Sequence, residues 1–180
     1  MTWDPVTDKR ILSLHPKIRD NAFNAVNELA ISDIYVRCTD GKRSIKYQEE
    51  LYNQPFDGRD NDHDGRIDEP DEKVTTVLIS PHLFGLAGDF VEIVNGRPMY
   101  VSNNYLRVGL IFEKHGFTWG GRWLSQHQRQ YNTVSEQNYL KQTGQGWDRP
   151  HVEMLFGFSY KKLWEMQKSG NVDSNGYIIL

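Results

Sequence analysis

The chain has 180 residues, of which 38% are apolar and 25% are charged, and its formal net charge is −3. This length suits one compact domain spanning residues 1–180. The charges of both signs are mixed, without the basic stripe of a nucleic-acid-binding protein, so we expect no nucleic-acid partner. No stretch approaches the roughly 18 consecutive apolar residues of a membrane span, so we expect no membrane insertion.

The first ten residues lack the apolar core of a signal peptide, so Sec export is not expected and extracellular action would need another route. Cys38 is the only cysteine and cannot form an internal disulfide. We expect it to be a buried, unreactive strand residue.

Apolar residues recur at helical spacing over 17–30, behind a proline in the first turn, which predicts an amphipathic helix. Residues 34–38 are β-branched and aromatic, which predicts a strand. Ser44 can cap a helix over 45–53. The following segment, 57–72, holds mostly acidic residues, glycine, asparagine and arginine, so it must be a loop.

Strand character returns over 75–79 and again over 90–94, and the Asn-Gly pair that follows predicts a tight hairpin turn before residues 99–101. Ser102 is expected to cap a helix that ends near Gly116, and a turn follows at 119–121. The polar, glutamine-rich stretch at about 124–147 is expected to be a long loop with one short helix. A strand over 151–155 and a helix over 159–168 complete the chain. This mixed order predicts an α+β fold, with helices packed on a small antiparallel sheet.

Two histidines have neighbours that set them apart from the other four. His82 precedes a run of small residues, and Asp89 then opens an apolar strand, where an unpaired charge would be costly. A histidine and an aspartate that flank a tight turn can supply two ligands to one zinc ion. The alternative is a capped turn with a hydrogen-bonded Asp89.

His151 begins the strand that follows Pro150, and Asp148 lies three residues before it. A catalytic zinc site has three protein ligands and one open position for water. His151 is the candidate third ligand, on the sheet face, and Asp148 is the candidate general base.

Together these motifs resemble the zinc peptidases that include D-alanyl-D-alanine carboxypeptidases and dipeptidases, and within them the L-alanyl-D-glutamate endopeptidases of bacteria and phage endolysins. The resemblance covers roughly residues 12–165. It rests on motifs in the family's order: His15-Pro16, Gly41-Lys-Arg43-Ser44 with Gln48 and Leu51-Tyr52, Ser80-x-His82-x-x-Gly85-x-Ala87-x-Asp89, Gly116-Phe-Thr-Trp-Gly-Gly121 and Asp148-x-x-His151-x-Glu153.

The resemblance implies that the chain is a catalytic domain with zinc held by His82, Asp89 and His151. It makes Asp148 the catalytic base and places Arg43 near the scissile carbonyl, where a guanidinium can stabilise an oxyanion. From the residues alone, Arg43 would be a surface charge in a turn.

Two further residues, Ser80 and Gln48, are expected to help to position the substrate or the metal ligands. The chain departs from the family in three places. Arg122 stands where relatives carry aspartate, the stretch at 124–147 is longer than in the short bacterial forms, and 57–72 is an acidic insertion.

The acidic insertion follows the pattern of an EF-hand calcium loop, with glycine at position six and an apolar residue at position eight. Asp71 stands at position twelve, where glutamate is usual, and Glu72 is a possible substitute. We therefore expect calcium to order the wall of the active site, the alternative being a solvated acidic loop. The candidate calcium ligands are Asp60, Asp62, Asp64, Arg66 through its backbone carbonyl, Asp68 and Asp71.

The sequence thus predicts a monomeric, zinc-dependent peptidoglycan endopeptidase that cleaves the L-alanyl-D-glutamate bond of stem peptides. Because no signal peptide is visible, we expect a phage or prophage endolysin that reaches the wall from the host cytoplasm after holin-type release. Two alternatives are a D-alanyl-D-alanine carboxypeptidase or dipeptidase with the same zinc site, and a wall-binding module without activity. A calcium-binding structural protein would explain only the acidic loop.

Overall fold

The structure is a computed structural model that describes residues 1–180, apart from the side chain of Asp71. Within the described chain it has the expected α+β architecture, with a small open antiparallel sheet and seven α-helices. The helices are α1 (Pro5–Ser13), α2 (Pro16–Ile31), α3 (Ile45–Asn53), α4 (Tyr105–Lys114), α5 (Gln126–Tyr131), α6 (Val134–Thr143) and α7 (Tyr160–Lys168). The strands are β1 (Val36–Asp40), β2 (Ala87–Val94), β3 (Arg97–Met99), β4 (Thr118–Trp119) and β5 (His151–Glu153).

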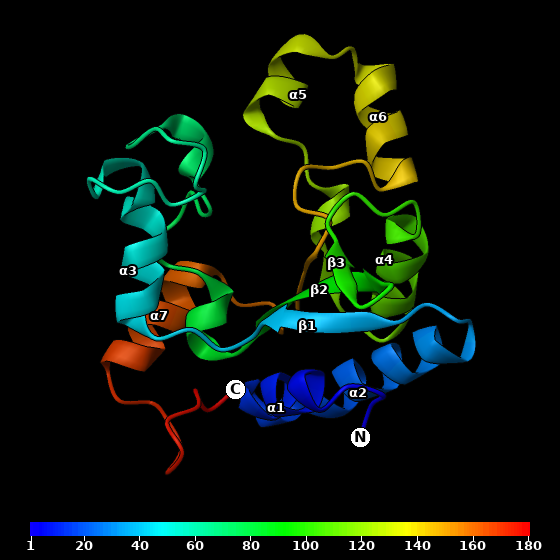
Figure 1. The fold of residues 1–180 in the computed structure, drawn as a ribbon. Coiled ribbons are helices and arrows are strands. Elements are labelled where there is room, and N and C mark those ends of the chain that lie inside the picture. Colours follow the sequence, from blue (N-terminus) through cyan, green and yellow to red (C-terminus); the bar gives the residue numbers. More distant parts are fainter.

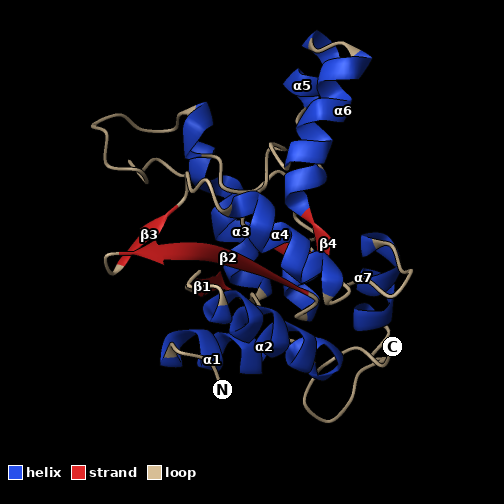
Figure 2. Cartoon of the chain, turned by 90° about the vertical axis from the view of Figure 1, so that its right-hand side faces the viewer, coloured by secondary structure: helices blue, strands red, loops and turns tan.

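The sheet has the order β1-β2-β5-β4, and β3 forms a hairpin with β2. Helices α1 and α2 lie beneath β1 and β2, whereas α5 and α6 form an arm that extends away from the body (Figures 1 and 2). None of the helices in the described chain is long and apolar enough to cross a bilayer.

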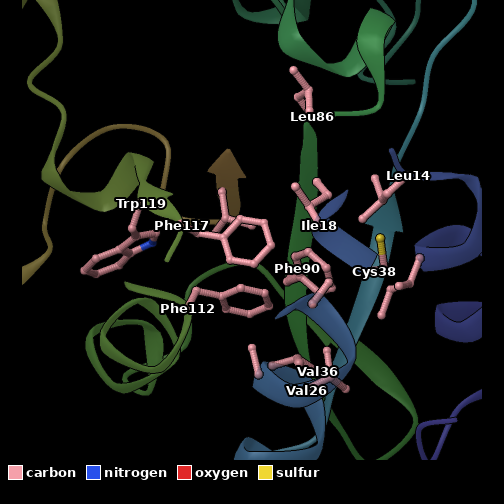
Figure 3. Close-up of a cluster of buried hydrophobic side chains, with 14 of the residues drawn as sticks. Leu14, Ile18, Val26, Val36, Cys38, Leu86, Phe90, Phe112, Phe117 and Trp119 are labelled. Atoms are coloured by element: carbon pink, nitrogen blue, oxygen red, sulfur yellow. The ribbon is translucent and has the colours of Figure 1, made fainter. Parts of the chain in front are cut away.

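The core lies between the sheet and the helices α2 and α4 (Figure 3). Phe90 of β2 stands opposite Cys38 of β1, and both side chains are fully buried. Phe112 of α4 packs on Phe90 with 4.4 Å between the ring centroids. Burial raises the pKa of the Cys38 thiol, as expected for an unreactive strand residue.

Alternation along β2 separates the core from the opposite face of the sheet. Phe90 points into the core, so the side chain of the preceding residue, Asp89, points to the other face. The pairing of β2 with β5 sets Asp89 directly opposite His151. Residues directly opposite each other on antiparallel strands share a face, so the sheet brings these two side chains together.

Three expectations about elements need correction, and one helix was not predicted. The predicted strand over 75–79 is absent. No strand pairs with this segment, and the carbonyl of Val77 accepts a hydrogen bond from the side chain of Gln48 instead. Helix α4 starts at Tyr105 and not at Ser102, whose hydroxyl instead accepts from the amide of Asn104 and donates to Glu92. The stretch at 124–147 holds two helices, and α1 was not predicted.

Candidate active site

A cleft of about 560 Å³ opens on the face of the sheet that carries Asp89. One wall is the irregular segment 74–77 that follows the acidic loop, and the other includes residues of the arm and the segment that returns from it. Side chains that matter for the chemistry gather in its lining: Arg43, Ser80, His82, Asp89, Asp148, His151 and Tyr160.

Three expected ligands converge in this cleft. His82 lies in the 3-10 helix Pro81–Phe84 (η3), which leads into β2, and contributes Nε2. This atom is 3.3 Å from His151 Nδ1 and 3.5 Å from Asp89 Oδ1, and His151 Nδ1 is 3.2 Å from Asp89 Oδ1. The two imidazoles are 2% and 6% exposed, whereas the Asp89 side chain is 20% exposed, so the meeting point is reached from the cleft alone.

In each imidazole, the nitrogen that points away from the other ligands donates a hydrogen bond to an oxygen acceptor. His82 Nδ1 donates to the carbonyl of Gly41 over 2.8 Å, and His151 Nε2 donates to the carboxylate of Glu153 over 3.2 Å. These partners hold the proton on the outer nitrogen of each ring, which leaves a lone pair on each inner nitrogen. The lone pairs and the Asp89 carboxylate therefore face one another, an arrangement that needs a cation.

The spacing fits a zinc ion. Bonds of about 2.0–2.1 Å arranged as a tetrahedron separate neighbouring ligand atoms by about 3.3 Å. The three measured separations, between 3.2 and 3.5 Å, agree with that value. Two nitrogens and one carboxylate oxygen are also a usual zinc donor set for a catalytic site.

The charges around the ligands are strongly coupled. Burial by itself would raise the pKa of Asp89, but the neighbouring His82 and His151 hold it well below its usual range. Burial alone would lower the pKa of His151, but its hydrogen bonds with Asp89 and Glu153 and the charges of Asp89 and Asp148 raise it to about 10. Without a metal ion, the site therefore retains a proton on His151 in place of the missing cation.

Asp148, the expected base, lines the cleft beside His151. Burial raises the pKa of Asp148, and the positive charge of His151 opposes that rise. Gly120, in the 3-10 helix Gly120–Arg122 (η4), makes this position possible. A Cβ at Gly120 would lie 2.3 Å from the carbonyl oxygen of Asp148 and 3.2 Å from the Cβ of His151. Only glycine lets η4 approach the base so closely.

Arg43 is a buried residue of the site and not a surface charge. Its guanidinium donates to Asp40 over 2.6 Å, to Gln48 over 3.2 Å and to the outer oxygen of Asp89 over 3.1 Å. Each terminal nitrogen of the guanidinium carries a second N–H, which a substrate oxygen can accept. The arrangement is compatible with the predicted contact to the scissile carbonyl, which stays a prediction.

Gln48 and Ser80 both act through neighbouring groups. Gln48 is 1% exposed and joins Arg43 to Thr75 and Val77, so its amide positions the arginine and the cleft wall. Ser80 is the N-cap of η3, where its hydroxyl accepts from the amide of His82. At the end of η3, Gly85 has a φ of +69°, and a Cβ there would lie 2.8 Å from the amide nitrogen of His15.

Sequence reasoning assigned no role to two residues next to His151. Glu153 is 5% exposed and accepts both from His151 Nε2 and from the hydroxyl of Tyr160, the latter over 2.6 Å. Trp123 packs on the His151 ring with 5.0 Å between the ring centroids. A role for Glu153 could have been predicted from its position two residues after His151, because side chains two residues apart in a strand lie on the same face.

Arg122, expected from the sequence to stand where the similar zinc peptidases carry aspartate, lines none of the cleft. It forms a bidentate ion pair with Glu113 of α4, over 2.9 and 2.8 Å, and donates to the carbonyls of Lys141 and Gln142 at the end of α6. The substitution therefore fastens the arm to the body.

In the acidic loop, carboxylates of Asp60, Asp62 and Glu72 have oxygens within 4.8 Å of one another. Glu72 is 3% exposed and accepts from the amides of Asn61 and Glu69. Asp64 and Asp68 do not belong to this group; the carboxylate of Asp68 accepts from the amide of Gly58 over 2.7 Å. The predicted ligand Asp71 has its side chain outside the described residues, and calcium binding stays a prediction.

Comparisons with known proteins bear on the fold and on the segment that carries two of the three grouped residues. Residues 73–130 match the family model described as D-alanyl-D-alanine carboxypeptidase, and this segment carries His82 and Asp89. No curated protein matches the sequence. Among solved structures, the chain is similar to the L-Ala D-Glu endopeptidase ChiX of Serratia marcescens, with a TM-score of 0.53 and 17% identity over 87% of this chain and 91% of that chain. The fold and the ligand-bearing segment together indicate a metallopeptidase.

Proposed function

We propose that the chain is a zinc-dependent peptidoglycan endopeptidase that hydrolyses the L-alanyl-D-glutamate bond of stem peptides. The observation that carries this proposal is the convergence of His82 Nε2, Asp89 Oδ1 and His151 Nδ1 at zinc spacing, in a cleft also lined by Asp148 and Arg43. The similarity to an L-Ala D-Glu endopeptidase over most of both chains supports the choice of bond.

In this proposal, the three ligands, Asp148 and Arg43 have separate roles in the reaction. A zinc ion held by the three ligands supplies Lewis-acid polarisation of the scissile carbonyl and activation of water. Asp148 accepts the proton of the attacking water and later donates it to the departing amine. Arg43, fixed by Asp40 and Gln48, donates to the carbonyl oxygen as that oxygen becomes negative.

The test is mass spectrometry of purified muropeptides incubated with zinc-loaded protein. New peptides with a free N-terminal D-glutamyl residue are expected from the wild type and not from His151→Ala. Asp148→Asn should retain zinc and lose turnover, which separates the role of the base from that of the ligands. Zinc-loaded wild type that forms no product from stems of several chemotypes would contradict the proposal and favour a binding module.

A D-alanyl-D-alanine carboxypeptidase with the same zinc site is the second candidate, because the matched family model carries that description. The same digest separates the two activities. Release of free D-alanine, with the L-alanyl-D-glutamate bond intact, would assign the chain to the carboxypeptidase branch.

We also propose that calcium binds the acidic loop through Asp60, Asp62 and Glu72 and stiffens the cleft wall that follows it. The proximity of these carboxylates supports this idea. Calcium should raise the melting temperature of zinc-loaded wild type, but not that of an Asp60→Asn/Asp62→Asn variant. If calcium raises the melting temperature of both proteins equally, it does not bind through Asp60 and Asp62.

The biological setting we propose is a phage or prophage endolysin that acts as a monomer after holin-type release from the host cytoplasm. Expression in a bacterial host should lyse the cells only when a holin is co-expressed. Lysis by the protein alone would contradict the need for a holin.

A further inference from the structure

A second, polar hollow of about 410 Å³ adjoins the cleft at Trp147, which lines both. It is enclosed by the turn that leads into α4 and by the segment that returns from the arm to β5. Asp148 and Pro150 line the catalytic cleft, whereas Arg149, between them, lines the hollow. The segment that carries the catalytic base therefore has the cleft on one side and the hollow on the other.

Trp147 belongs to both spaces, and it also borders a third depression at the base of the arm. Its side chain is 47% exposed, although its backbone amide is fixed by a bond of 3.0 Å to the carbonyl of Trp123. Within the described residues, the indole N–H has no hydrogen-bond partner. An indole held in this way offers a flat apolar face and a free donor at the border of the cleft.

The wall of the hollow is rich in neutral hydrogen-bonding groups. It contains the side-chain amides of Asn103 and Gln145, and the hydroxyl groups of Ser102 and Thr143, whose own protons go to Glu92 and to the carbonyl of Tyr139. No acidic residue lines it among those the structure describes, so the hollow is unsuited to a cation. Arg149 is its only cation, with the guanidinium 5.3 Å from the ring centroid of Tyr105.

Two groups in this wall have hydrogen-bonding capacity that the protein leaves unused. The Arg149 guanidinium has no hydrogen bond or ion pair within the described chain, while its backbone carbonyl is held by Trp119 Nε1 over 2.7 Å. Tyr105 is 2% exposed, and its hydroxyl is buried without a partner among the described residues. A buried hydroxyl without a partner is uncommon in protein interiors and calls for a ligand or ordered water. The guanidinium of Arg149 is half-buried, so it is accessible to a ligand in the hollow.

An apolar ring face beside amide, hydroxyl and guanidinium donors is the chemistry that recognises an amino sugar. One face of a pyranose is formed by C–H groups, and its hydroxyl and N-acetyl groups need donors and acceptors. In peptidoglycan, the L-alanine of the stem is joined through a lactyl group to N-acetylmuramic acid. A cleft that receives the bond after L-alanine must therefore have the sugar beside it.

We propose that this hollow binds the N-acetylmuramic acid residue that carries the stem peptide, with Trp147 packed on the sugar ring and Arg149 donating to its polar groups. This inference rests on the proposed function, and it adds the part of the substrate that is not peptide. The chain would then distinguish stems still attached to glycan from free peptides.

The test compares two substrates for the zinc-loaded wild type: a disaccharide-tripeptide, and the same tripeptide with a free N-lactyl group. Both present an L-alanine acylated by a lactyl group, so they differ only in the glycan. We expect kcat/KM to be at least about tenfold higher for the glycan form, since one well-placed contact of 1.4 kcal/mol gives that factor.

Trp147→Ala and Arg149→Met should each bring the ratio of the two kcat/KM values close to one. Tyr139→Ala is the matched control, because Tyr139 is a 58% exposed aromatic on α6 that lines none of these spaces. It should retain the wild-type ratio. Zinc content and melting temperature of each variant exclude a general loss of folding.

Binding of the peptide-free disaccharide, followed by the NMR signal of the Trp147 indole N–H, does not depend on hydrolysis. A shift of this signal without cleavage of either substrate would uphold the sugar site and refute the peptidase. Equal kcat/KM for both substrates, with no shift, would overturn the sugar site and leave the peptidase intact. Neither cleavage nor a shift would refute both.

Discussion

The imidazole of His151 lies between two carboxylates, and only one of them faces the metal position. Asp89 meets Nδ1, whereas Glu153 meets Nε2 and is itself fixed by the hydroxyl of Tyr160. These two partners fix the orientation of the ring, and Glu153 keeps a proton on Nε2, so that Nδ1 is the nitrogen that loses its proton when a metal ion binds. Its role as a ligand depends on a residue that touches neither metal nor substrate.

Glu153→Gln should weaken zinc binding by about 10- to 100-fold, because an amide no longer fixes the proton on His151 Nε2. Zinc affinity can be measured by competition with a chelator. Tyr160→Phe is the matched control, since it keeps the Glu153 carboxylate and removes only one of its partners. It should lose less affinity than Glu153→Gln. Wild-type zinc affinity in Glu153→Gln would show that the orientation of the ring is set elsewhere.

Zinc binding should release a proton at neutral pH. The pKa of His151 is raised to about 10 in the metal-free protein, so this residue is protonated at pH 7 and must lose a proton before Nδ1 can bind the ion. Zinc affinity should therefore fall by about tenfold for each unit by which the pH is lowered below that pKa. Calorimetry in buffers of different ionisation enthalpy measures the released proton. Binding heats that are independent of the buffer would contradict this account.

At the scale of elements, the arm is fastened to the body through Arg122. Its guanidinium joins Glu113 of α4 to the last carbonyls of α6. Arg122→Ala should expose 124–147 to faster cleavage in limited proteolysis, while zinc affinity stays unchanged. Because this ion pair is partly exposed, the global loss of stability should be only about 0.5–1 kcal/mol.

Lys114→Ala is the control for this change, because it removes another α4 ion pair, with Glu28 of α2, in which no residue of the arm takes part. It should leave the proteolysis of 124–147 as in the wild type. If both variants are cleaved equally fast, Arg122 has no special function in holding the arm.

The elements that could be predicted are those whose signal is local. Apolar residues at helical spacing marked α2, and Ser44 marked the start of α3. The strand expected over 75–79 failed because β-branched residues give strand character without supplying a neighbouring strand. The arm has no buried face in α5 or α6, so periodicity could not reveal it. Its readable signals were two capping boxes, at Ser125 and Thr133.

The grouping of His82, Asp89 and His151 could be predicted, because their residue types and the order of the surrounding motifs resemble those of known zinc peptidases. A positioning role for Gln48 could be predicted in the same way, but its contact with Arg43 could not, and Glu153 was given no role because its contact depends on which nitrogen of His151 faces inward. Arg122 was recognisable as a departure, but only its contacts with Glu113 of α4 and with the end of α6 explain it.

At the scale of the whole molecule, the C-terminal segment packs against the corner between α1 and α2 near the N-terminus. Ile178 is 2% exposed, and its carbonyl accepts from His15 Nε2 over 2.8 Å at the corner between α1 and α2. Tyr177 donates to the carbonyl of Ser13, and Lys42 lies 4.0 Å from the centroid of its ring. This tail therefore braces the segment that carries Gly41 and Arg43.

Ile178→Ala should lower the free energy of unfolding by about 2–4 kcal/mol, because it leaves a cavity at this junction. The neighbouring Ile179 is 55% exposed, so Ile179→Ala should cost less than about 0.5 kcal/mol. Chemical denaturation measures both values. Equal costs would show that the tail packs too loosely to contribute to stability.

The pairing of Asp89 with His151 has a consequence for how such a protein can change over time. The ligands are held by the register of β2 and β5, and not by the 61 residues that separate them in the chain. Segments that connect the elements carrying these residues, such as the arm and the acidic loop, can therefore lengthen, shorten or be exchanged while the arrangement of the ligands is retained. Selection for a new substrate can act on these two segments, which form the walls of the cleft, and both can be exchanged in an engineered protein.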